Sequence, residues 1–558
     1  MLYSNCLIMG IPSYFSFIVK NHPRIITKFI RRAMVVNNLY LDCNSIIYDV
    51  VKKHDFSDSA NSDIAKHNIS IITNVIYQIE EYINNINPTN NVYIAFDGVA
   101  PVAKLDQQRN RRYKSWYQNN VHKQIFKKAT LDPFNTTSIT PGTEFMNILN
   151  DRIYTHFSAI NKRNKVDPSN TKRYIVSGSD CPSEGEHKLF QHIRENPVEH
   201  STATTVIYGL DADLIMLSIN HLPLCGKIYL FRETPEFIKS IDSSLEPNET
   251  YVLDIEMLSE MIKLNMVTNQ DDAQATATAN INKNVVHDYI FICFFLGNDF
   301  MPHFPALNIR SGGVNKVLDA YKETMGKTNE VLTDGKTIYW NNVRKFVGYL
   351  KQKEEVYIQT EIKLRDRRSK NVPRDDTPEN AFAKFESIPN YERELEKSIN
   401  PFRPFWQNRY YKSLLRMDPP DNERKKQISM NYLEGLEWNM KYYTSGCVDW
   451  RWSYKHHYPP LLEDLYNYIP LFETTLLPKQ LMNPVNPMVQ LCYVIPLSSL
   501  NLLPVELHHK MMTECQKWYK SDCDFVWAFC RYFWEAHVDL PHIDIKELEE
   551  FLAKNKIC

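Results

Sequence analysis

Seven acids in the sequence are spaced so that they could act together. The stretch SGSDCPSEGEHKLF (177–190) places two glutamates at the start of a predicted helix, and single acids or acid pairs follow other short apolar segments. The seven acids are Asp42, Asp97, Glu184, Glu186, Asp211, Asp213 and Asp299. Carboxylates that gather in one place repel one another unless cations lie between them. The chemistry open to these acids therefore depends on whether the fold brings them together.

Each acid also has an ordinary structural interpretation. A glutamate at a helix N-terminus commonly caps the helix and interacts favourably with its dipole. The chain contains 66 acids, so pairs such as Asp-x-Asp arise by chance. A functional interpretation therefore requires the whole set to lie at one place.

The first half of the chain has the pattern of a doubly wound α/β domain with a mostly parallel sheet. Its short segments rich in Val, Ile, Tyr or Phe are typical of buried strands. We expect strands at 37–42, 91–97, 172–178, 204–209 and 227–231. Helical spacing lies between them, as at 70–83 and 185–195. Alternation of this kind predicts the α/β fold class.

The acids follow the ends of these predicted strands. Ligands of an open parallel sheet bind outside the carboxyl ends of its strands, so four successive strands would deliver acids to one edge. Asp211 and Asp213 would project to the same side if their segment is extended. Asp299 follows an apolar helix predicted at 289–297 and could join the cluster.

Clustered carboxylates stay ionised together only when hard cations accompany them. Oxygen ligands without a nearby Cys/His set favour Mg²⁺ or Mn²⁺. Two such ions, about 4 Å apart, can activate water and stabilise the leaving oxygen of a phosphodiester. The sequence therefore predicts metal-dependent hydrolysis of phosphodiesters with two bound ions.

A basic helix face follows the second predicted strand. In VAKLDQQRNRRYKSW (102–116), helical spacing places Lys104, Gln108, Arg111 and Arg112 within an arc of roughly 80–100°. A run of charges is most often a solvated helix face. However, Arg and Lys suit the oxygens of a terminal phosphate, which Arg can bind in a bidentate manner. Beside a metal site, this face would hold the 5′ end of a strand.

Bulk properties narrow the class of protein. The 558 residues are 43% hydrophobic and 23% charged, as in soluble globular proteins, and the net charge is −1. The 11 cysteines are dispersed and form no Cys-x-x-Cys, so we expect reduced thiols in a cytosol-like compartment. No signal peptide or membrane-spanning run is apparent. We expect a cytoplasmic monomer without membrane contact. No nuclear-import signal is apparent, and a nuclear location stays the alternative.

Two further stretches suggest the domain organisation. The polar stretch at 265–284 is interpreted as a surface loop, and the charged stretch at 363–380 as a solvated connection. We expect a nuclease domain over 1–325, a helical and charged connecting region over 326–400, and a second, mainly helical lobe over 401–558.

Longer motifs resemble the Xrn-type 5′→3′ exoribonucleases over nearly the whole chain. In the first half they include MGIPSYF (9–15), LYLDCNSIIY (39–48), SEGEHK (183–188) and FFLGNDFMPHFP (294–305). In the second half they include LEGLEWNMKYYTSGCVDWRWSYKHHYPP (433–460) and FWEAHVDLPHID (533–544). The resemblance implies a PIN/FEN-like nuclease core and a second lobe that packs on the active site.

The resemblance also implies roles for individual residues. The family has seven metal-site acids, and all seven have counterparts in the acids named above. Its 5′-monophosphate pocket carries over onto Lys104, Gln108, Arg111 and Arg112. These enzymes degrade single-stranded RNA with a 5′ monophosphate to mononucleotides, processively and with divalent metal. They stack leading bases on aromatic groups, which implies Trp450 or Trp452 as a platform. We expect His456 and His457 to be structural.

Three departures from the family pattern are visible. A His six residues after the first Asp is Tyr48 here, which can still stack on a base but cannot supply that titratable group. Family members begin at the Met-Gly-Ile-Pro that starts here at Met9. The chain also ends soon after the second set of motifs, so we expect a minimal catalytic core lacking the long C-terminal extension. Protein partners are left open.

Two other functions compete with this interpretation. A flap-type, structure-specific DNA 5′ nuclease resembles the family in its sheet and acids, but FPALNIRSGGVNKV (304–317) is a poor match to the expected helix-hairpin-helix. The second competing function is that of a catalytically silent RNA-binding scaffold. Retention of all seven acids disfavours it, because clustered charge is costly without metal.

Overall fold

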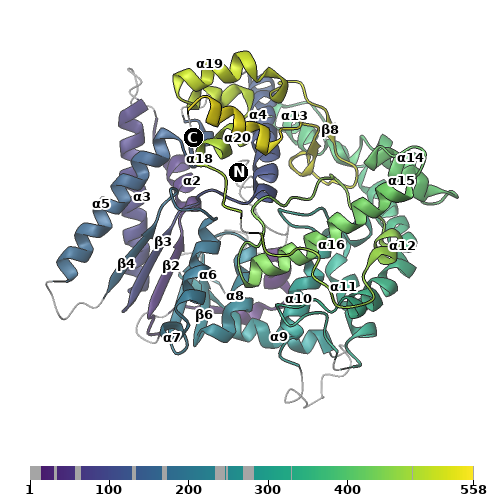
Figure 1. The fold of residues 1–558 in the computed structure, drawn as a ribbon, viewed down its shortest axis with the longest axis horizontal. Helices are drawn as coiled ribbons and strands as arrows, with labels where there is room; N and C mark the ends of the chain where they lie inside the picture. The colour runs from purple at the N-terminus through teal and green to yellow at the C-terminus, as the bar shows by residue number, and fades with distance from the viewer. Residues whose placement is uncertain are drawn as a thin grey trace.

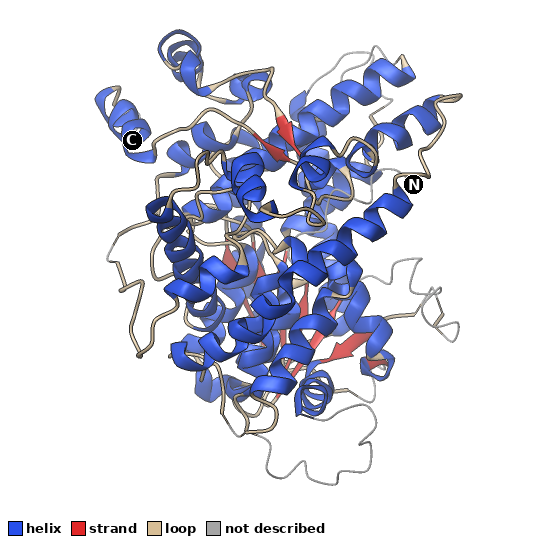
Figure 2. Ribbon diagram, turned by 90° about the vertical axis from the view of Figure 1, so that its right-hand side faces the viewer, coloured by secondary structure: helices blue, strands red, loops and turns tan. Residues whose placement is uncertain are grey.

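The computed structural model describes residues 14–29, 34–56, 64–127, 134–165, 172–232, 245–246, 249–267, 282–328, 330–480 and 482–556. A central sheet lies on one side of the molecule, and a large helical region lies on the other (Figure 1). Seen from the helical side, helices lie in front of the strands of the sheet (Figure 2).

The sheet has seven strands in the order β1-β7-β6-β5-β2-β3-β4. Five adjacent strands are parallel: β6 (Lys227–Phe231), β5 (Thr204–Tyr208), β2 (Asn38–Asp42), β3 (Asn91–Ala95) and β4 (Arg173–Ser177). All five were predicted from their apolar runs, and the α/β fold class is confirmed. The sequence did not indicate the antiparallel edge strands β1 (Ile26–Lys28) and β7 (Tyr251–Asp254), which are only three and four residues long.

Alternate residues of the strands face two different layers of helices. Leu39 and Leu41 pack with α2 (Asn44–Lys53), α3 (Ile64–Ile86) and α5 (Glu144–Asn164) on one face. Tyr40 points to the other face, where α6 (Gly185–Glu195), α8 (Asp213–His221) and α9 (Ile255–Val267) lie. This alternation follows from the two-residue period of a strand.

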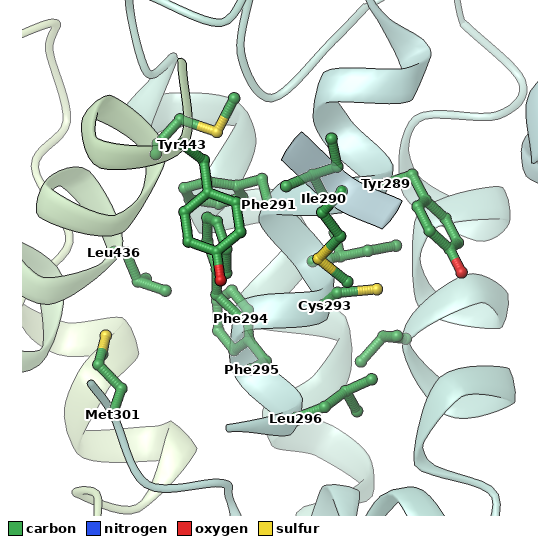
Figure 3. Close-up of a cluster of buried hydrophobic side chains, with 14 of the residues drawn as sticks. Tyr289, Ile290, Phe291, Cys293, Phe294, Phe295, Leu296, Met301, Leu436 and Tyr443 are labelled. Atoms are coloured by element: carbon green, nitrogen blue, oxygen red, sulfur yellow. The ribbon is translucent and has the colours of Figure 1, made fainter. Parts of the chain in front are cut away.

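The predicted apolar helix forms part of the core between the two regions. Helix α10 (Val285–Cys293) is buried except for the half-buried His287, and the short turn Phe294–Leu296 is fully buried. Phe291 and Phe294 lie on the side of Leu436 and Tyr443 of α16 (Asn422–Thr444), whereas Tyr289 points to the opposite side, as Figure 3 shows. Tyr443 meets Phe294 edge-on with ring centroids 5.3 Å apart. The end of α10 thus leads directly to the loop that carries Asp299.

The second region is mainly helical, as predicted. Its longest helices are α12 (Trp340–Arg368) and α16. The other helices are α11 (Gly313–Thr324), α13 (Pro378–Glu386), α14 (Glu394–Ile399), α15 (Trp406–Leu415), α17 (Leu462–Tyr468), α18 (Pro487–Val494), α19 (Val505–Glu514) and α20 (Ile545–Lys554). The last three pack with the start of α4 (Val102–Phe126) in a separate apolar cluster.

Two predicted loops differ from the structure. The stretch 363–380 is not simply a solvated connection, because α12 continues to Arg368 and α13 begins at Pro378. Arg365 is buried and pairs with Glu396 at 2.8 Å, which holds this stretch in the protein. Of the polar stretch 265–284, residues 265–267 belong to α9, and 268–281 lie outside the described residues.

The three predicted regions share one apolar core. The largest buried cluster runs from Tyr14 to Phe529, so the boundaries at 325 and 400 stay a prediction.

The nine cysteines in the described part of the chain are free thiols. Among the described helices, none has the length and apolar character needed to cross a bilayer.

Candidate active site

The acids lie at the carboxyl edge of the sheet, where its order reverses between β2 and β5. Such a crevice is the usual ligand site of an open α/β sheet. Asp42 is the last residue of β2, and Asp97 follows β3. Glu184 is the N-cap residue of α6, and Glu186 lies in its first turn. The remaining acids come from the loop after β5 (Asp211), the start of α8 (Asp213) and the loop after α10 (Asp299).

One expectation about the acid pair is wrong. The segment of Asp211 and Asp213 is not extended, because it turns into α8 at Asp213. The backbone N–H of Asp213 donates to Oδ1 of Asp211 at 3.0 Å, which is the geometry of an aspartate-stabilised turn. Both carboxylates nevertheless remain at the sheet edge.

The N-terminus of α6 contacts the carboxylates of Asp42 and Asp97. The backbone N–H of Gly185 donates to Oδ1 of Asp97 at 2.7 Å. A Cβ at position 185 would lie 2.4 Å from Oδ1 of Asp42, which is too close for any side chain. Glycine therefore allows the carboxylates from three strand ends to approach one another.

Burial and mutual repulsion raise the pKa values of the clustered carboxyl groups. Burial is the largest cause of a raised pKa in each of five acids, and neighbouring carboxylates add to it: Asp42, Glu184, Glu186, Asp211 and Asp213. The pKa of Asp211 reaches about 7, and Asp299 is the neighbour that repels it most. These acids therefore form one electrostatically connected cluster.

Lys104 lies within the acid cluster. Its Nζ is 2.6 Å from Oε1 of Glu184 and 2.7 Å from Oδ2 of Asp299. Burial tends to lower the pKa of Lys104, but the carboxylates of Asp299 and Glu184 outweigh it, so this pKa is raised well above its ordinary value. The sequence placed Lys104 on the basic face of α4, and the structure adds that it joins this face to the acids.

Several buried oxygens of the cluster have no hydrogen-bond partner. They are Oδ1 of Asp42, Oε2 of Glu186 and Oδ1 of Asp213. A buried carboxylate oxygen without a donor costs free energy, which a bound cation would offset. The donors are mainly carboxylate oxygens, and the nearby imidazole of His187 belongs to a set with Glu184 and Glu186 whose ligand atoms lie within 4.8 Å. The cluster therefore fits divalent metal ions.

Hydrogen bonds that sequence reasoning missed hold the acids in place. The side chain of Asn44 donates to Oδ2 of Asp97 at 2.6 Å and accepts from the backbone N–H of Asp97 at 3.0 Å. Nζ of Lys188 donates to the carbonyl oxygens of Phe96 and Gly178 at 2.7 Å each, which ties together the ends of β3 and β4. Burial lowers the pKa of Lys188 to about 8.

Helix α16 of the second region reaches the acids. The hydroxyl of Tyr442 donates to Oε2 of Glu184 at 2.8 Å, and its ring stacks on His187 with centroids 3.7 Å apart. On the other side, the Tyr442 ring stacks on Trp438 at 4.6 Å, and Trp438 stacks on Trp452 at 5.2 Å. A column of four rings therefore begins at the metal-site helix α6 and ends in the core of the second region.

A second contact from α16 orders the loop of Asp299. Asn298 donates to Oδ1 of Asn439 at 2.7 Å, and Oδ1 of Asn298 accepts from the backbone N–H groups of Phe300 and Met301. The acid between these residues is thereby fixed. The second region thus contributes to the geometry of the site without contributing an acid.

The basic residues of α4 follow the acid cluster along the helix. Gln108 is buried, and its Oε1 has no hydrogen-bond partner. Nη1 of Arg112 is likewise buried without an acceptor. Burial lowers the pKa of Arg112 to about 10; the hydroxyl of Tyr48 partly opposes this, and the nearby Arg111 adds to it. The free Nη1 donor of Arg112 fits an anion, whereas Oε1 of Gln108 is an acceptor.

The two candidate tryptophans lie in different environments. Trp452 is buried with 6% of its surface exposed, as the last ring of the column. Trp450 is half-buried, and its carbonyl accepts from the backbone N–H of Val102 at the start of α4. His457 stacks on His537 at 5.0 Å, and His456 meets Tyr454 edge-on. Burial lowers the pKa of His456 to about 4, so this imidazole is neutral at pH 7.

Comparison with known proteins decides the family. A family profile described as "XRN 5′-3′ exonuclease N-terminus" matches residues 9–234, and a second, described as "Xrn1 helical domain", matches residues 279–400 and 384–556. The chain belongs to the XRN 5′-3′ exonuclease family. The family resemblance is thus confirmed: the first profile covers six of the acids, and the second covers Asp299 and α16.

Curated relatives match over nearly the whole chain. The "5′-3′ exoribonuclease 2 homolog" of Drosophila melanogaster is 25% identical, with 98% of this chain and 71% of the relative covered. The "5′-3′ exoribonuclease 1" of Saccharomyces cerevisiae is 25% identical, with 97% and 43% covered, and that of Homo sapiens is 28% identical, with 97% and 34% covered. The XRN family members named exoribonuclease 1 are thus much longer than this chain.

Solved structures give a weaker match. Two structures of the catalytic core of Rad2 in complex with DNA substrate match at 14% and 12% identity, with TM-scores of 0.32 and 0.31. They cover 69% and 64% of this chain, and 85% and 79% of their own chains. These scores are too low to establish a shared fold.

Proposed function

We propose that this protein is a 5′→3′ exoribonuclease that hydrolyses single-stranded RNA bearing a 5′ monophosphate and releases mononucleotides processively. The observation that carries the proposal is the meeting of seven acids with the basic face of α4, joined by Lys104. The family and the names of its relatives favour RNA degradation from the 5′ end. A site that holds the terminal phosphate beside the hydrolytic centre would release one nucleotide at a time.

Two Mg²⁺ or Mn²⁺ ions are the proposed cofactors. Asp42, Asp97, Glu184, Glu186, Asp211, Asp213 and Asp299 would hold them, and the orphaned carboxylate oxygens support this assignment. When bound, such ions supply an activated water and charge stabilisation at the leaving oxygen. Tyr442 and Asn44 would hold the Glu184 and Asp97 carboxylates in the required orientation.

Lys104 would change its role when metal binds. Without metal its ammonium neutralises Glu184 and Asp299. With Glu184 and Asp299 holding cations, the Lys104 ammonium would be available to bind a phosphate oxygen. Lys104 would then act together with Gln108, Arg111 and Arg112 on the 5′ phosphate, at successive turns of α4.

Substrate selection would follow from the shape of this pocket. Buried donors such as Nη1 of Arg112 suit a monophosphate, whereas a cap or triphosphate needs more room. Trp450 is the proposed base platform because it is half-buried at the start of α4, whereas Trp452 lies in the core. Tyr48, within electrostatic reach of Arg112, would also stack on a leading base.

The competing functions have less support. The curated relatives are named exoribonucleases, which does not favour a flap-type DNA nuclease. A silent scaffold would not need buried carboxylate oxygens without donors. We further propose a cytoplasmic monomer, and the free thiols of the described cysteines agree with a reducing compartment.

A panel of RNA ends tests the function. We expect 5′-monophosphate RNA to be degraded to mononucleotides in Mg²⁺, much faster than 5′-hydroxyl RNA, 5′-triphosphate RNA or matched DNA, and not at all in EDTA. Preference for branched DNA would support the flap nuclease instead. Binding without turnover in Mg²⁺ or Mn²⁺ would support the scaffold.

A further inference from the structure

Arg232 lies at the same sheet edge as the acids, directly after β6. In the parallel pairing of β5 and β6, Tyr208 is opposite Phe231, and the backbone N–H of Gly209 donates to the carbonyl of Phe231 at 3.3 Å. Arg232 therefore lies beside the start of the loop that carries Asp211.

The guanidinium of Arg232 has few partners in the protein. It lies over the ring of Phe15, 3.8 Å from the centroid. Among the described residues, no hydrogen bond or ion pair to Arg232 is found, and its Nε is buried without an acceptor. Burial lowers its pKa to about 10, and the negative charge of Asp211 partly opposes this. Unused donors on a cation held by an aromatic ring suit an external anion.

The order of the strands places Arg232 across the acid cluster from the basic face of α4. Helix α4 follows β3, whereas Arg232 follows β6, with β2 and β5 between them (Figure 1). Neighbouring strands are about 4.8 Å apart, so these two strand ends are separated by roughly 14 Å. The two strands between them end at Asp42 and lead into the loop of Asp211. An RNA strand that places its 5′ phosphate on α4 and its scissile phosphate on the acids would continue toward Arg232.

We propose that Arg232 binds the RNA phosphate on the 3′ side of the scissile bond. This inference rests on the proposed exoribonuclease function and extends it, because it assigns a contact to the part of the substrate that remains bound after cleavage. Such a contact would help to keep the shortened strand in place for the next cycle. The aromatic ring of Phe15 would position the guanidinium without using any of its N–H donors.

Binding of 5′-monophosphate RNA in EDTA tests the contact without turnover. We expect Arg232→Gln to weaken binding roughly tenfold, as for loss of a charged hydrogen bond, and to reduce the slope of log K against log salt by about 0.7. A neutral methylphosphonate at the phosphate after the scissile one, with a 2′-deoxy sugar beside it, should weaken binding to the wild type. The same methylphosphonate should not weaken RNA binding to the Arg232→Gln variant any further.

Matched variants separate this contact from other roles. Lys227→Gln removes an exposed cation at the opposite end of β6 and should leave affinity and salt slope unchanged. Arg232→Lys keeps the charge and should keep the slope, and thermal unfolding checks that each variant is folded. Equal sensitivity of wild type and Arg232→Gln to the methylphosphonate would overturn the inference. So would a variant with weaker Mg²⁺ binding but unchanged RNA binding, which would mean that Arg232 orients Asp211.

The two proposals fail in different ways. If wild-type protein does not degrade RNA in Mg²⁺ or Mn²⁺, the proposed function fails, whatever Arg232 does. If wild-type protein degrades 5′-monophosphate RNA and Arg232→Gln has an unchanged salt slope, only the Arg232 contact is wrong.

Discussion

The hydroxyl group of Tyr442 donates a 2.8 Å hydrogen bond to Oε2 of Glu184, although the two residues are 258 positions apart. This bond joins helix α16 of the second region to the acid at the N-cap of α6. Second-sphere hydrogen bonds to a metal ligand commonly affect metal affinity by 10–100-fold. The helical region therefore does more than cover the site, because it orients one of its carboxylates.

Tyr442→Phe should weaken Mg²⁺ binding by roughly tenfold while leaving the fold intact, because it removes the hydroxyl but keeps the stacked ring. Calorimetric titration with Mg²⁺ would measure the change in Mg²⁺ affinity. Tyr410→Phe, on α15, is a matched control, since that buried hydroxyl donates to the carbonyl of Pro459 rather than to an acid of the cluster. Equal Mg²⁺ affinity in wild type and Tyr442→Phe would show that Glu184 does not need this donor.

Arg111→Ala should reduce the preference for 5′-monophosphate over 5′-hydroxyl RNA, by roughly tenfold, because a charged hydrogen bond to the phosphate is lost. The ratio of kcat/KM for the two substrates is the measurement. Lys123→Ala, about three turns further along α4, controls for a general loss of positive charge. A preference unchanged by Arg111→Ala would remove this residue from the pocket.

The two tryptophans should respond differently to truncation. Trp452→Ala should destabilise the fold by about 3–5 kcal/mol, because the ring is buried on Trp438. Trp450→Ala should cost little stability but weaken RNA binding by about 1–3 kcal/mol, as for loss of one stacked base. Denaturant unfolding and fluorescence anisotropy would separate the effects. Normal RNA affinity in a folded Trp450→Ala variant would contradict its role as the platform.

Glu354 provides a pH-dependent test of how the second region is held together. Its Oε1 accepts from the backbone N–H of Leu462 at the start of α17, and burial raises its pKa from 4.5 to about 8. The native state therefore binds this proton more tightly than the unfolded state. The contribution of Glu354 to stability is full below pH 4.5 and is lost as the pH rises to about 8.

Glu354→Gln removes this titration and keeps an acceptor of similar shape. The free energy of unfolding of the variant relative to wild type should therefore increase with pH, by at most about 1.4 kcal/mol per pH unit between pH 4.5 and 8. Denaturant unfolding at pH 6 and pH 8 would measure the difference. A difference independent of pH would mean that Glu354 is ionised throughout.

The sequence predicted those parts of the fold and site that depend on local pattern. Five parallel strands and helix α6 have clear apolar periodicity, and Asp42, Asp97 and Glu184 follow strand ends, where a parallel sheet gathers ligands. Edge strand β1 has only three residues and was missed, because so short a segment carries no readable period. The turn at Asp211 was missed because the Asp side chain competes for the backbone N–H of Asp213.

Contacts between distant segments could not be predicted in this way. No sequence spacing connects Tyr442 with Glu184, or Lys104 with Asp299, because these pairs meet only through tertiary packing. Arg232 illustrates the same limit. Its position after a predicted strand was visible, but its lack of protein partners and its contact with Phe15 appear only in three dimensions.

The most direct test of the central claim is single-turnover degradation of 5′-end-labelled monophosphate RNA by wild type and Asp211→Ala in Mg²⁺. Because Asp211 belongs to one connected acid cluster, we expect the variant to lose nearly all cleavage while it remains folded and still binds RNA. Undiminished release of the labelled 5′ nucleotide by a folded Asp211→Ala protein would contradict the assignment of these acids to a metal-dependent hydrolytic site.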